Sequence, residues 1–219
     1  MGEVELDKAN HILTIHADLV FYGHAADDML AKQVAADVST HWNEPNGAVL
    51  LDHEWYQVRF SIKGFYAPAL TDIEVYSNDN PRINYFRIEA YASGNISFVD
   101  GLNCNTGYFQ LDNLFNNSTT AAHEFGHTLG LDHPHILDIR GQGIPGIMYP
   151  RGTLVDPPFQ YDPSVPAGVK GGTMNPYTRK VLQKDIENLR LHRLSFNENG
   201  FAVLGDFSSI WHDAHLKTD

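Results

Sequence analysis

The stretch AAHEFGHTLGLDHP, residues 121–134, constrains the fold more than any other part of the chain. In an α-helix, His123 and His127 lie one turn apart on the same face, so both imidazoles can reach one ion. Gly130 can adopt a positive φ, which ends the helix and turns the chain sharply. The turn brings His133 back as a third nitrogen ligand. The pattern therefore predicts a helix, a tight turn and a three-histidine metal site.

Three nitrogen ligands leave one position of a tetrahedral zinc ion open to water, as in catalytic rather than structural sites. Zinc lowers the pKa of such a water to about 7. Glu124 follows His123 by about 100° around the helix, so it can act as a base near the ion without being a ligand. It would take the proton from the attacking water and deliver it to the leaving amine. The expected chemistry is peptide-bond hydrolysis without a covalent intermediate.

The length of the motif separates this interpretation from chance. A two-histidine H-E-x-x-H can also be a surface-helix feature or a satisfied core pair. The full H-E-x-x-H-x-x-G-x-x-H spacing requires further residues to agree with one three-dimensional geometry, which favours a metal site.

Composition narrows the remaining choices. The chain has 219 residues, of which 42% are hydrophobic, as in one globular domain. The formal net charge of −12 argues against nucleic acid or an anionic membrane as a partner. No apolar run approaches the roughly 20 residues that span a bilayer, and the first residues lack a basic signal-peptide region. Cys104 is the only cysteine, which excludes an intrachain disulfide and a cysteine-rich zinc site.

Residue patterns in the first half of the chain indicate a mixture of strands and one helix. Residues 12–22 alternate as a strand, residues 25–42 have helical spacing, and residues 56–63 alternate again. We expect further strands at 72–77, 84–91, 95–99 and 107–111.

The second half is less regular. Asn116, Asn117 or Ser118 is the expected N-cap of the motif helix. Residues 134–178 hold eight of the eleven prolines and predict an ordered loop. A last helix is expected over 178–193, and the apolar tail from 195 to 219 predicts a hairpin packed on the domain. The fold class is α+β, with a single domain over 1–219.

His123, Glu124, His127, Gly130 and His133 together resemble the extended zinc signature of the metzincin metallopeptidases. The words "HTLGLDHP" look most like the matrixin and serralysin branches, and "RKVLQKDIENLR" resembles the matrixin C-terminal helix. The detailed match covers about residues 121–193. The resemblance implies a twisted mixed sheet, an active-site helix, and a zinc cleft between an N-terminal subdomain (about 1–133) and a smaller C-terminal one (about 134–219).

The family also has a methionine-bearing turn beneath the zinc. "PGIMYP" makes Met148 the favoured candidate, and "GGTMNPY" offers Met174 as the alternative. The chain departs from the family in its long spacing after His133. It also lacks the matrixin propeptide cysteine motif and the glycine-aspartate calcium repeats of serralysins.

The resemblance further implies that peptide substrate binds in an extended form along a sheet-edge strand, for which residues 105–111 are the candidate. The proline-rich stretch after Met148 is longer than in a matrixin. We expect this stretch, residues 152–172, to narrow the cleft as a fixed wall and to restrict the substrates.

Several other residues have two interpretations. His135 is an alternate ligand or, as we expect, an exposed loop residue. Asp100, Gly101 and Asp112 could bind Ca²⁺, although a hairpin turn is favoured. Further assignments are Tyr149, Tyr161 or Tyr177 as an oxyanion donor, Cys104 as a small buried residue rather than a zinc inhibitor, and Trp42 and Trp55 as core residues.

The leading functional prediction is a zinc endopeptidase that acts on protein or peptide substrates, with His123, His127 and His133 as metal ligands and Glu124 as the catalytic base. The alternatives are a narrow-specificity effector protease and a catalytically silent zinc-dependent binding module. We expect an extracellular or exported monomer with one catalytic Zn²⁺ and no nucleic-acid partner.

Overall fold

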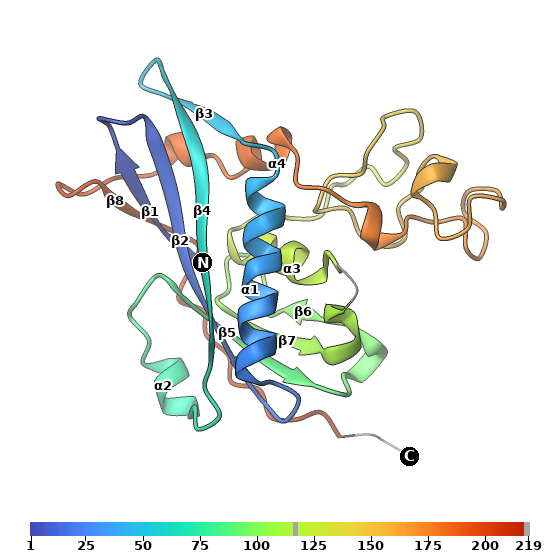
Figure 1. The fold of residues 1–219 in the computed structure, drawn as a ribbon, viewed down its shortest axis with the longest axis horizontal. Helices are drawn as coiled ribbons and strands as arrows, with labels where there is room; N and C mark the ends of the chain where they lie inside the picture. The colour runs from blue at the N-terminus through green and yellow to red at the C-terminus, as the bar shows by residue number, and fades with distance from the viewer. Residues whose placement is uncertain (116–117, 217–219) are drawn as a thin grey trace.

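One mixed β-sheet organises the computed structural model, which describes residues 1–115 and 118–216 (Figure 1). The sheet order is β3-β4-β2-β5-β7-β6, with β1 on β2 and β8 on β1. The strands are β1 (Gly2–Asp7), β2 (Ile12–Tyr22), β3 (Ala48–Leu51), β4 (Glu54–Tyr66), β5 (Ile83–Glu89), β6 (Phe98–Val99), β7 (Thr106–Gln110) and β8 (Phe201–Leu204). The helices are α1 (Asp28–Asn43), α2 (Asp72–Tyr76), α3 (Thr120–Thr128) and α4 (Gln183–Asn188). The predicted α+β class is confirmed.

Strand β2 is the centre of the sheet. It runs parallel to β4 over Ile12–Phe21 and parallel to β5 over Asp18–Tyr22, while its first half pairs antiparallel with β1. Its predicted bounds, residues 12–22, are confirmed. Every second side chain from Leu13 to Phe21 is buried, because successive residues of a strand point to opposite faces.

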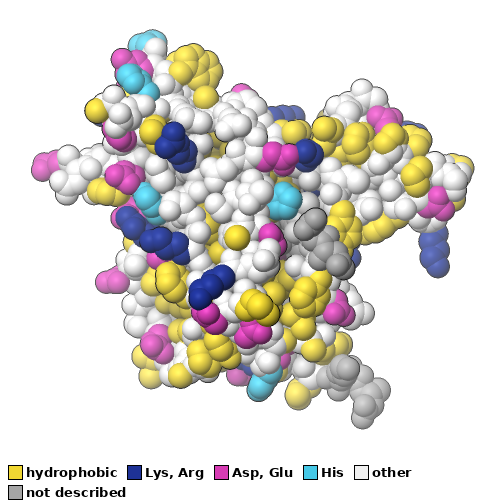
Figure 2. Space-filling view, viewed as in Figure 1, with side chains coloured by type: hydrophobic (Ala, Val, Ile, Leu, Met, Phe, Trp, Pro, Cys, Tyr) yellow, Lys and Arg dark blue, Asp and Glu magenta, His cyan; other side chains and the backbone are white. Residues whose placement is uncertain are grey.

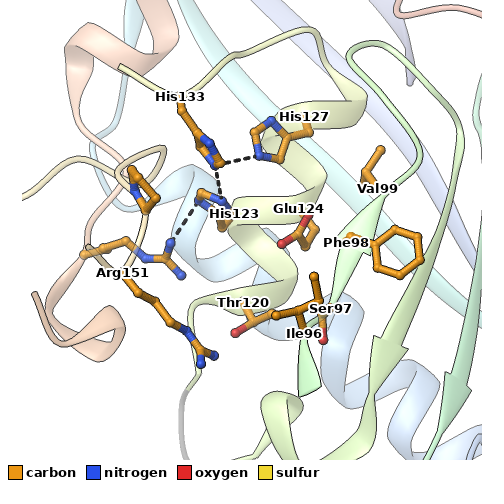
Figure 3. A pocket seen from close by; sticks show the side chains of 12 residues that line it. Ile96, Ser97, Phe98, Val99, Thr120, His123, Glu124, His127, His133 and Arg151 are labelled. Carbon is orange, nitrogen blue, oxygen red and sulfur yellow. Dashed lines mark hydrogen bonds between the residues drawn. The ribbon is translucent and has the colours of Figure 1, made fainter. Parts of the chain in front are cut away.

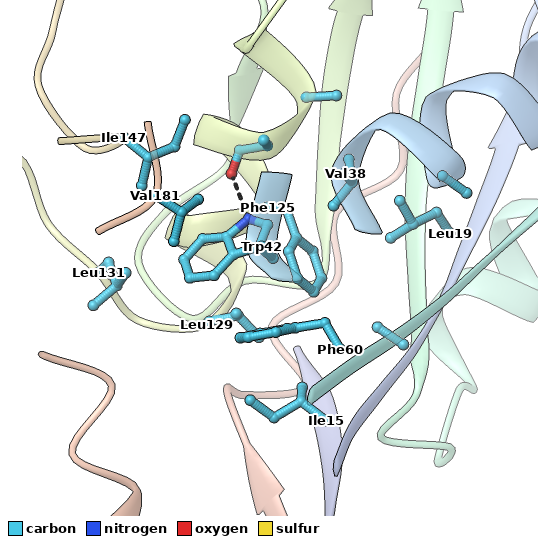
Figure 4. Packing of buried hydrophobic residues seen from close by; sticks show 14 of the residues in the cluster. Ile15, Leu19, Val38, Trp42, Phe60, Phe125, Leu129, Leu131, Ile147 and Val181 are labelled. Carbon is cyan, nitrogen blue, oxygen red and sulfur yellow. Dashed lines mark hydrogen bonds between the residues drawn. The ribbon is translucent and has the colours of Figure 1, made fainter. Parts of the chain in front are cut away.

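Helix α1 packs against the sheet and against α3, and its last turn joins both (Figure 4). The Trp42 ring lies 5.0 Å from Phe60 of β4 and 6.0 Å from Phe125 of α3, and its indole N–H donates to the Ala122 carbonyl at 3.0 Å. Trp42 is fully buried, as predicted. Trp42 therefore attaches the motif helix to the main core both by packing and by a hydrogen bond.

The strand expected at residues 72–77 is wrong, because Asp72–Tyr76 form helix α2. A capping box explains the difference. The Thr71 hydroxyl accepts from the Glu74 N–H at 3.4 Å, and the Glu74 carboxylate accepts from the Thr71 N–H at 2.9 Å. These two bonds satisfy donors that a helix start leaves open, which stabilises a short helix over a strand.

The C-terminal elements also differ from expectation. The last helix is shorter than residues 178–193, since α4 spans only Gln183–Asn188. Over residues 195–216 the tail forms no hairpin of its own; β8 instead pairs antiparallel with β1. Trp55 is 64% exposed on β4, so its assignment to the core is wrong.

Residues 134–178 form a projecting lobe with no long helix or strand (Figure 1). The lobe has a small core of its own, made by Ile139, Val155 and Met174, with Tyr149 and Phe159 packed against it. The expectation of an ordered loop is thus confirmed. No helix of the described chain is long and apolar enough to cross a membrane.

Candidate metal centre and cleft

Helix α3 carries the motif and is buried over most of its length. It begins after Thr119, and the Ser118 hydroxyl accepts from the Thr120 N–H at 3.1 Å. The predicted N-caps Asn116 and Asn117 lie outside the described residues. Phe125 points into the main core, so the opposite side of the helix presents His123 and His127 to the cleft.

Gly130 ends α3 with a positive φ of 90°, as predicted. The Gly130 N–H donates to the His127 carbonyl at 3.0 Å, and the Leu131 N–H donates to the Gly126 carbonyl at 3.0 Å. This pair of bonds is the Schellman arrangement, which satisfies carbonyls that the helix end leaves free. A Cβ at Gly130 would lie 2.3 Å from the Asn103 side-chain oxygen. Both the conformation and the space therefore require glycine here.

The turn places three imidazoles around one point (Figure 3). The His133 Nε2 lies 3.1 Å from the Nε2 of His123 and 3.1 Å from the Nε2 of His127. Zinc–nitrogen bonds of about 2.0–2.1 Å in tetrahedral geometry hold nitrogens roughly 3.3 Å apart. The three histidines are thus positioned to hold a metal ion, and the spacing is compatible with zinc. No other group of three or more His, Cys, Asp or Glu side chains gathers in this way among the described residues.

Backbone carbonyls orient two of the imidazoles. The His123 Nδ1 lies 2.7 Å from the Ile147 carbonyl, and the His127 Nδ1 lies 2.7 Å from the Leu131 carbonyl. A carbonyl can only accept, so each Nδ1 carries the proton and each Nε2 keeps its lone pair for an ion. Arg179 Nη1 also lies 3.0 Å from the His123 Nδ1, but it donates to the Tyr149 carbonyl at 3.0 Å instead.

The electrostatics of the triad favour neutral imidazoles. Burial lowers the pKa of His123 well below its ordinary value, and the Arg179 charge lowers it further. Burial also lowers the pKa of His127 and that of His133, the most exposed of the three histidines. Metal binding needs deprotonated ligands, so the protein provides the ligand state that an ion requires at neutral pH.

Met148 lies directly under the triad helix. Its side chain is buried, and a Cβ added to Gly126 would meet the Met148 sulfur at 2.4 Å. Gly126 thus allows the methionine to approach the backbone of α3 between His123 and His127. Met174, the alternative candidate for the methionine turn, lies in the separate core of the projecting lobe.

The imidazoles open into a cleft of about 360 Å³. One wall is α3, a second is the segment from Ile96 to Val99, and a third is formed by Pro150, Arg151 and Arg179. None of the residues that line it belongs to 152–172, so the expected wall from that stretch is wrong. The stretch stands away from the cleft and packs on the lobe's own core.

The strand beside this cleft differs from the one expected. Residues 105–111 correspond to β7, which pairs with β5 on one side and β6 on the other. The edge strand is β6, Phe98–Val99, which lies across the cleft from α3 (Figure 3). The sequence predicted a strand at 95–99. It did not predict that this strand pairs antiparallel with β7 and so becomes the edge of the sheet.

Glu124 points into the same cleft, beside β6 (Figure 3). It is 7% exposed, and its carboxylate accepts a hydrogen bond from the Val99 N–H. Burial raises its pKa to about 8, against the opposing effects of the Arg179 charge and the Val99 bond. A divalent cation at the triad would lower this pKa, because it favours the ionised form. The group is therefore able to exchange a proton near neutral pH.

Two arginines of the cleft were missed by sequence reasoning. Arg151 follows the favoured methionine turn, and Arg179 precedes α4, 56 positions after His123. Neither has a distinctive spacing from the motif, so no local signal could have identified them.

The remaining candidate residues lie elsewhere. His135 is exposed and outside the triad, as expected. The Asp100 carboxylate accepts from the Thr106 hydroxyl at 2.5 Å and pairs with His212 at 2.8 Å, and no acidic cluster gathers around it in the described chain. Cys104 is a free, buried thiol, as predicted. The three tyrosines proposed as oxyanion donors, Tyr149, Tyr161 and Tyr177, are absent from the cleft lining.

Comparison with known proteins supplies no relative: no protein-family model matches the chain, and no curated protein matches it in sequence.

Proposed function

We propose that the protein is a zinc-dependent endopeptidase with a metzincin-like active site. One observation carries the proposal: three imidazoles converge within a cleft that Glu124 also lines. A structural zinc site would have four protein ligands. The described residues supply only three, next to a carboxylate that is free to act as a base.

In this proposal His123, His127 and His133 hold the ion, which supplies a Lewis acid and lowers the pKa of water to about 7. Glu124 takes the proton of the attacking water and transfers it to the leaving amine. Its buried position keeps competing water away from the carboxylate. Met148 supports the imidazoles from below as a hydrophobic floor.

The edge strand supports a peptide substrate in particular. A sheet edge presents unpaired N–H and C=O groups, with which an extended peptide can pair. We assign this task to β6, in place of residues 105–111, because β6 is the outer strand and lines the cleft. Backbone pairing of this kind is indifferent to the side chains of the substrate.

The test compares the parent protein with Glu124→Gln, which changes the base and leaves the three ligands. We expect the parent to bind one zinc per chain and to cleave a labelled peptide library, with activity lost on chelation. Glu124→Gln should keep the zinc and lose about 10²-fold or more in turnover. Near-native turnover by the variant would contradict the role of Glu124.

The same assay separates the alternatives. A silent binding module would bind zinc and peptide without cleaving any library member. An effector protease would cleave a few members of a proteome-derived library and leave the others intact.

A further inference from the structure

Two guanidinium groups occupy one side of the cleft beside the triad. Arg151 enters from the segment after Met148, and Arg179 from the segment before α4. Arg151 lies across the cleft from Phe98 and Val99 (Figure 3). Burial is the main cause of the lowered pKa of Arg179, and the Arg151 charge lowers it further, as expected for two groups that line one cleft. The fold thus brings together two like charges that are far apart in the sequence.

Arg179 is buried, and the one carboxylate whose charge raises its pKa is the catalytic candidate Glu124, with which it forms no salt bridge. Its Nε donates to the Thr119 hydroxyl at 3.0 Å, and its Nη1 donates to the Tyr149 carbonyl at 3.0 Å. Within residues 1–115 and 118–216, it takes part in no salt bridge. The Arg179 Nη2 makes no hydrogen bond to these residues, and it is not a fully buried atom left without a partner. A buried cation of this kind is costly unless an anion compensates it.

Arg151 is exposed, and its one hydrogen bond among the described residues is a long contact of 3.4 Å to the Asn113 side chain. Both arginines thus make their hydrogen bonds to neutral oxygens, with Glu124 as the one nearby carboxylate, and both keep donors for a further anion. A purely structural role would account for Arg179, which ties Thr119 to Tyr149. It does not account for Arg151, which holds no element in place.

The charge of the cleft is opposite to that of the protein. The chain has 27 acidic and 15 basic residues, excluding histidine, and Asp and Glu side chains are dispersed over the face seen in Figure 2. The cleft lining nevertheless has two arginines and a single carboxylate, Glu124. In a narrow site such a local excess attracts anions despite an acidic exterior.

We propose that Arg151 and Arg179 form a carboxylate-binding subsite beside the histidine triad, so that the cleft selects peptides with an acidic side chain or a free C-terminal carboxylate next to the scissile bond. This inference rests on the proposed peptidase function. The planar guanidinium fork matches a carboxylate in geometry and can bind it through two parallel hydrogen bonds. Arg179 provides a fixed, desolvated charge, and Arg151 closes on the same carboxylate from the solvent side.

The experiment measures binding in the zinc-loaded Glu124→Gln protein, so that cleavage does not interfere. Four labelled peptide libraries are compared, with Asp and Glu or with Asn and Gln, each made with a free or an amidated C-terminus. Arg151→Gln and Arg151→Glu test the subsite. Arg140→Gln is the matched control, because Arg140 is an exposed arginine of the same lobe that pairs with Asp138 outside the cleft.

We expect one type of carboxylate to raise affinity about fivefold or more, as for a partly desolvated charge pair. Preference for Asp and Glu regardless of the C-terminus indicates side-chain recognition, whereas preference for the free terminus indicates terminal-carboxylate recognition. Arg151→Gln should remove most of the preference, Arg151→Glu should reverse it, and Arg140→Gln should leave it unchanged. Added salt should weaken it.

Two results would overturn the inference. Equal affinity for all four libraries, with measurable binding, would remove the subsite and leave the peptidase proposal intact. An equal loss of affinity for acidic and neutral peptides in Arg151→Gln would assign this residue to general positioning. Failure to bind any peptide would overturn the proposed function and this inference with it.

Discussion

Two neighbouring regions of the molecule are built in different ways. Helix α3 is packed into the main core through Trp42 and Phe125, and its end is shaped by hydrogen-bonded turn geometry. The projecting lobe at 134–178 has only three buried residues of its own as a core. The candidate metal centre takes its histidines from the first region or the turn that follows it, and parts of its cleft walls from the second.

The lobe reaches the site through residues 147–151, which lie within it, and through Arg179, which directly follows it. The Lys180 N–H donates to the Pro145 carbonyl at 3.0 Å, which ties these two segments together. We expect that the stretch between them can vary without moving the imidazoles. The comparison indicates that zinc binding and lobe stability are separable properties.

The largest effect should follow from the removal of a ligand in the first region. His133→Ala takes away one of three protein nitrogens, so zinc affinity should fall by orders of magnitude. His135→Ala is the matched control, since it removes an exposed histidine two positions away. Zinc content measured by elemental analysis after dialysis checks both variants. Full occupancy in His133→Ala would show that the third ligand is a different residue.

The attachment of α3 to the main core gives the next largest effect. Trp42→Ala leaves a cavity between α1, β4 and α3 and deletes the bond to Ala122, so the free energy of unfolding should fall by about 3–5 kcal/mol. Trp42→Phe keeps most of the volume and should cost about 1–2 kcal/mol for the unpaired carbonyl and lost contacts. Denaturant titration measures both values. A negligible loss in Trp42→Ala would contradict the central place of this side chain.

The burial of Glu124 predicts a pH dependence of the metal-free protein. Its pKa is about 8 in the folded state and near 4.5 when unfolded. Between these values the folded state binds more protons, so its contribution to stability falls as pH rises, by at most about 1.4 kcal/mol per pH unit.

Glu124→Gln removes this contribution, and the variant should gain stability relative to the parent from pH 4.5 to 8. The histidines, with lowered pKa values, act in the opposite direction below about pH 6.5, but equally in both proteins. Thermal unfolding in the presence of a chelator measures the difference. A constant difference across this range would contradict the raised pKa. Zinc should reduce this stability difference between the two proteins, because a cation stabilises the ionised carboxylate.

The smallest effects sharpen the comparison between the two regions. Met148→Ala and Met174→Ala make the same change in two different cores. The first should lower zinc affinity about tenfold, since it removes support beneath the imidazoles. The second should destabilise the lobe by about 2 kcal/mol and leave zinc affinity unchanged. Calorimetric zinc titration of both variants checks this, and a loss of affinity in Met174→Ala alone would reverse the assignment of the methionine turn.

Local sequence determined the elements whose reason is local. The alternation of residues 12–22 predicted β2 because one face of a strand is buried, and the spacing around Gly130 predicted a helix end because only glycine takes that φ without strain. The convergence of His123, His127 and His133 follows from these two facts and helical periodicity. The histidine triad was therefore predictable from fourteen consecutive residues, 121–134.

Tertiary structure decided what depends on distant partners. Both β6 and β7 read as strands, but which of them is the sheet edge depends on pairing with β5, which no local pattern encodes. Arg179 lies beside His123, 56 positions away in the chain, because the segments around Pro145 and Lys180 are held together. The sequence by itself thus specified the histidine triad of the candidate metal centre. The walls and charge of its cleft were specified only when segments far apart in the chain came into contact.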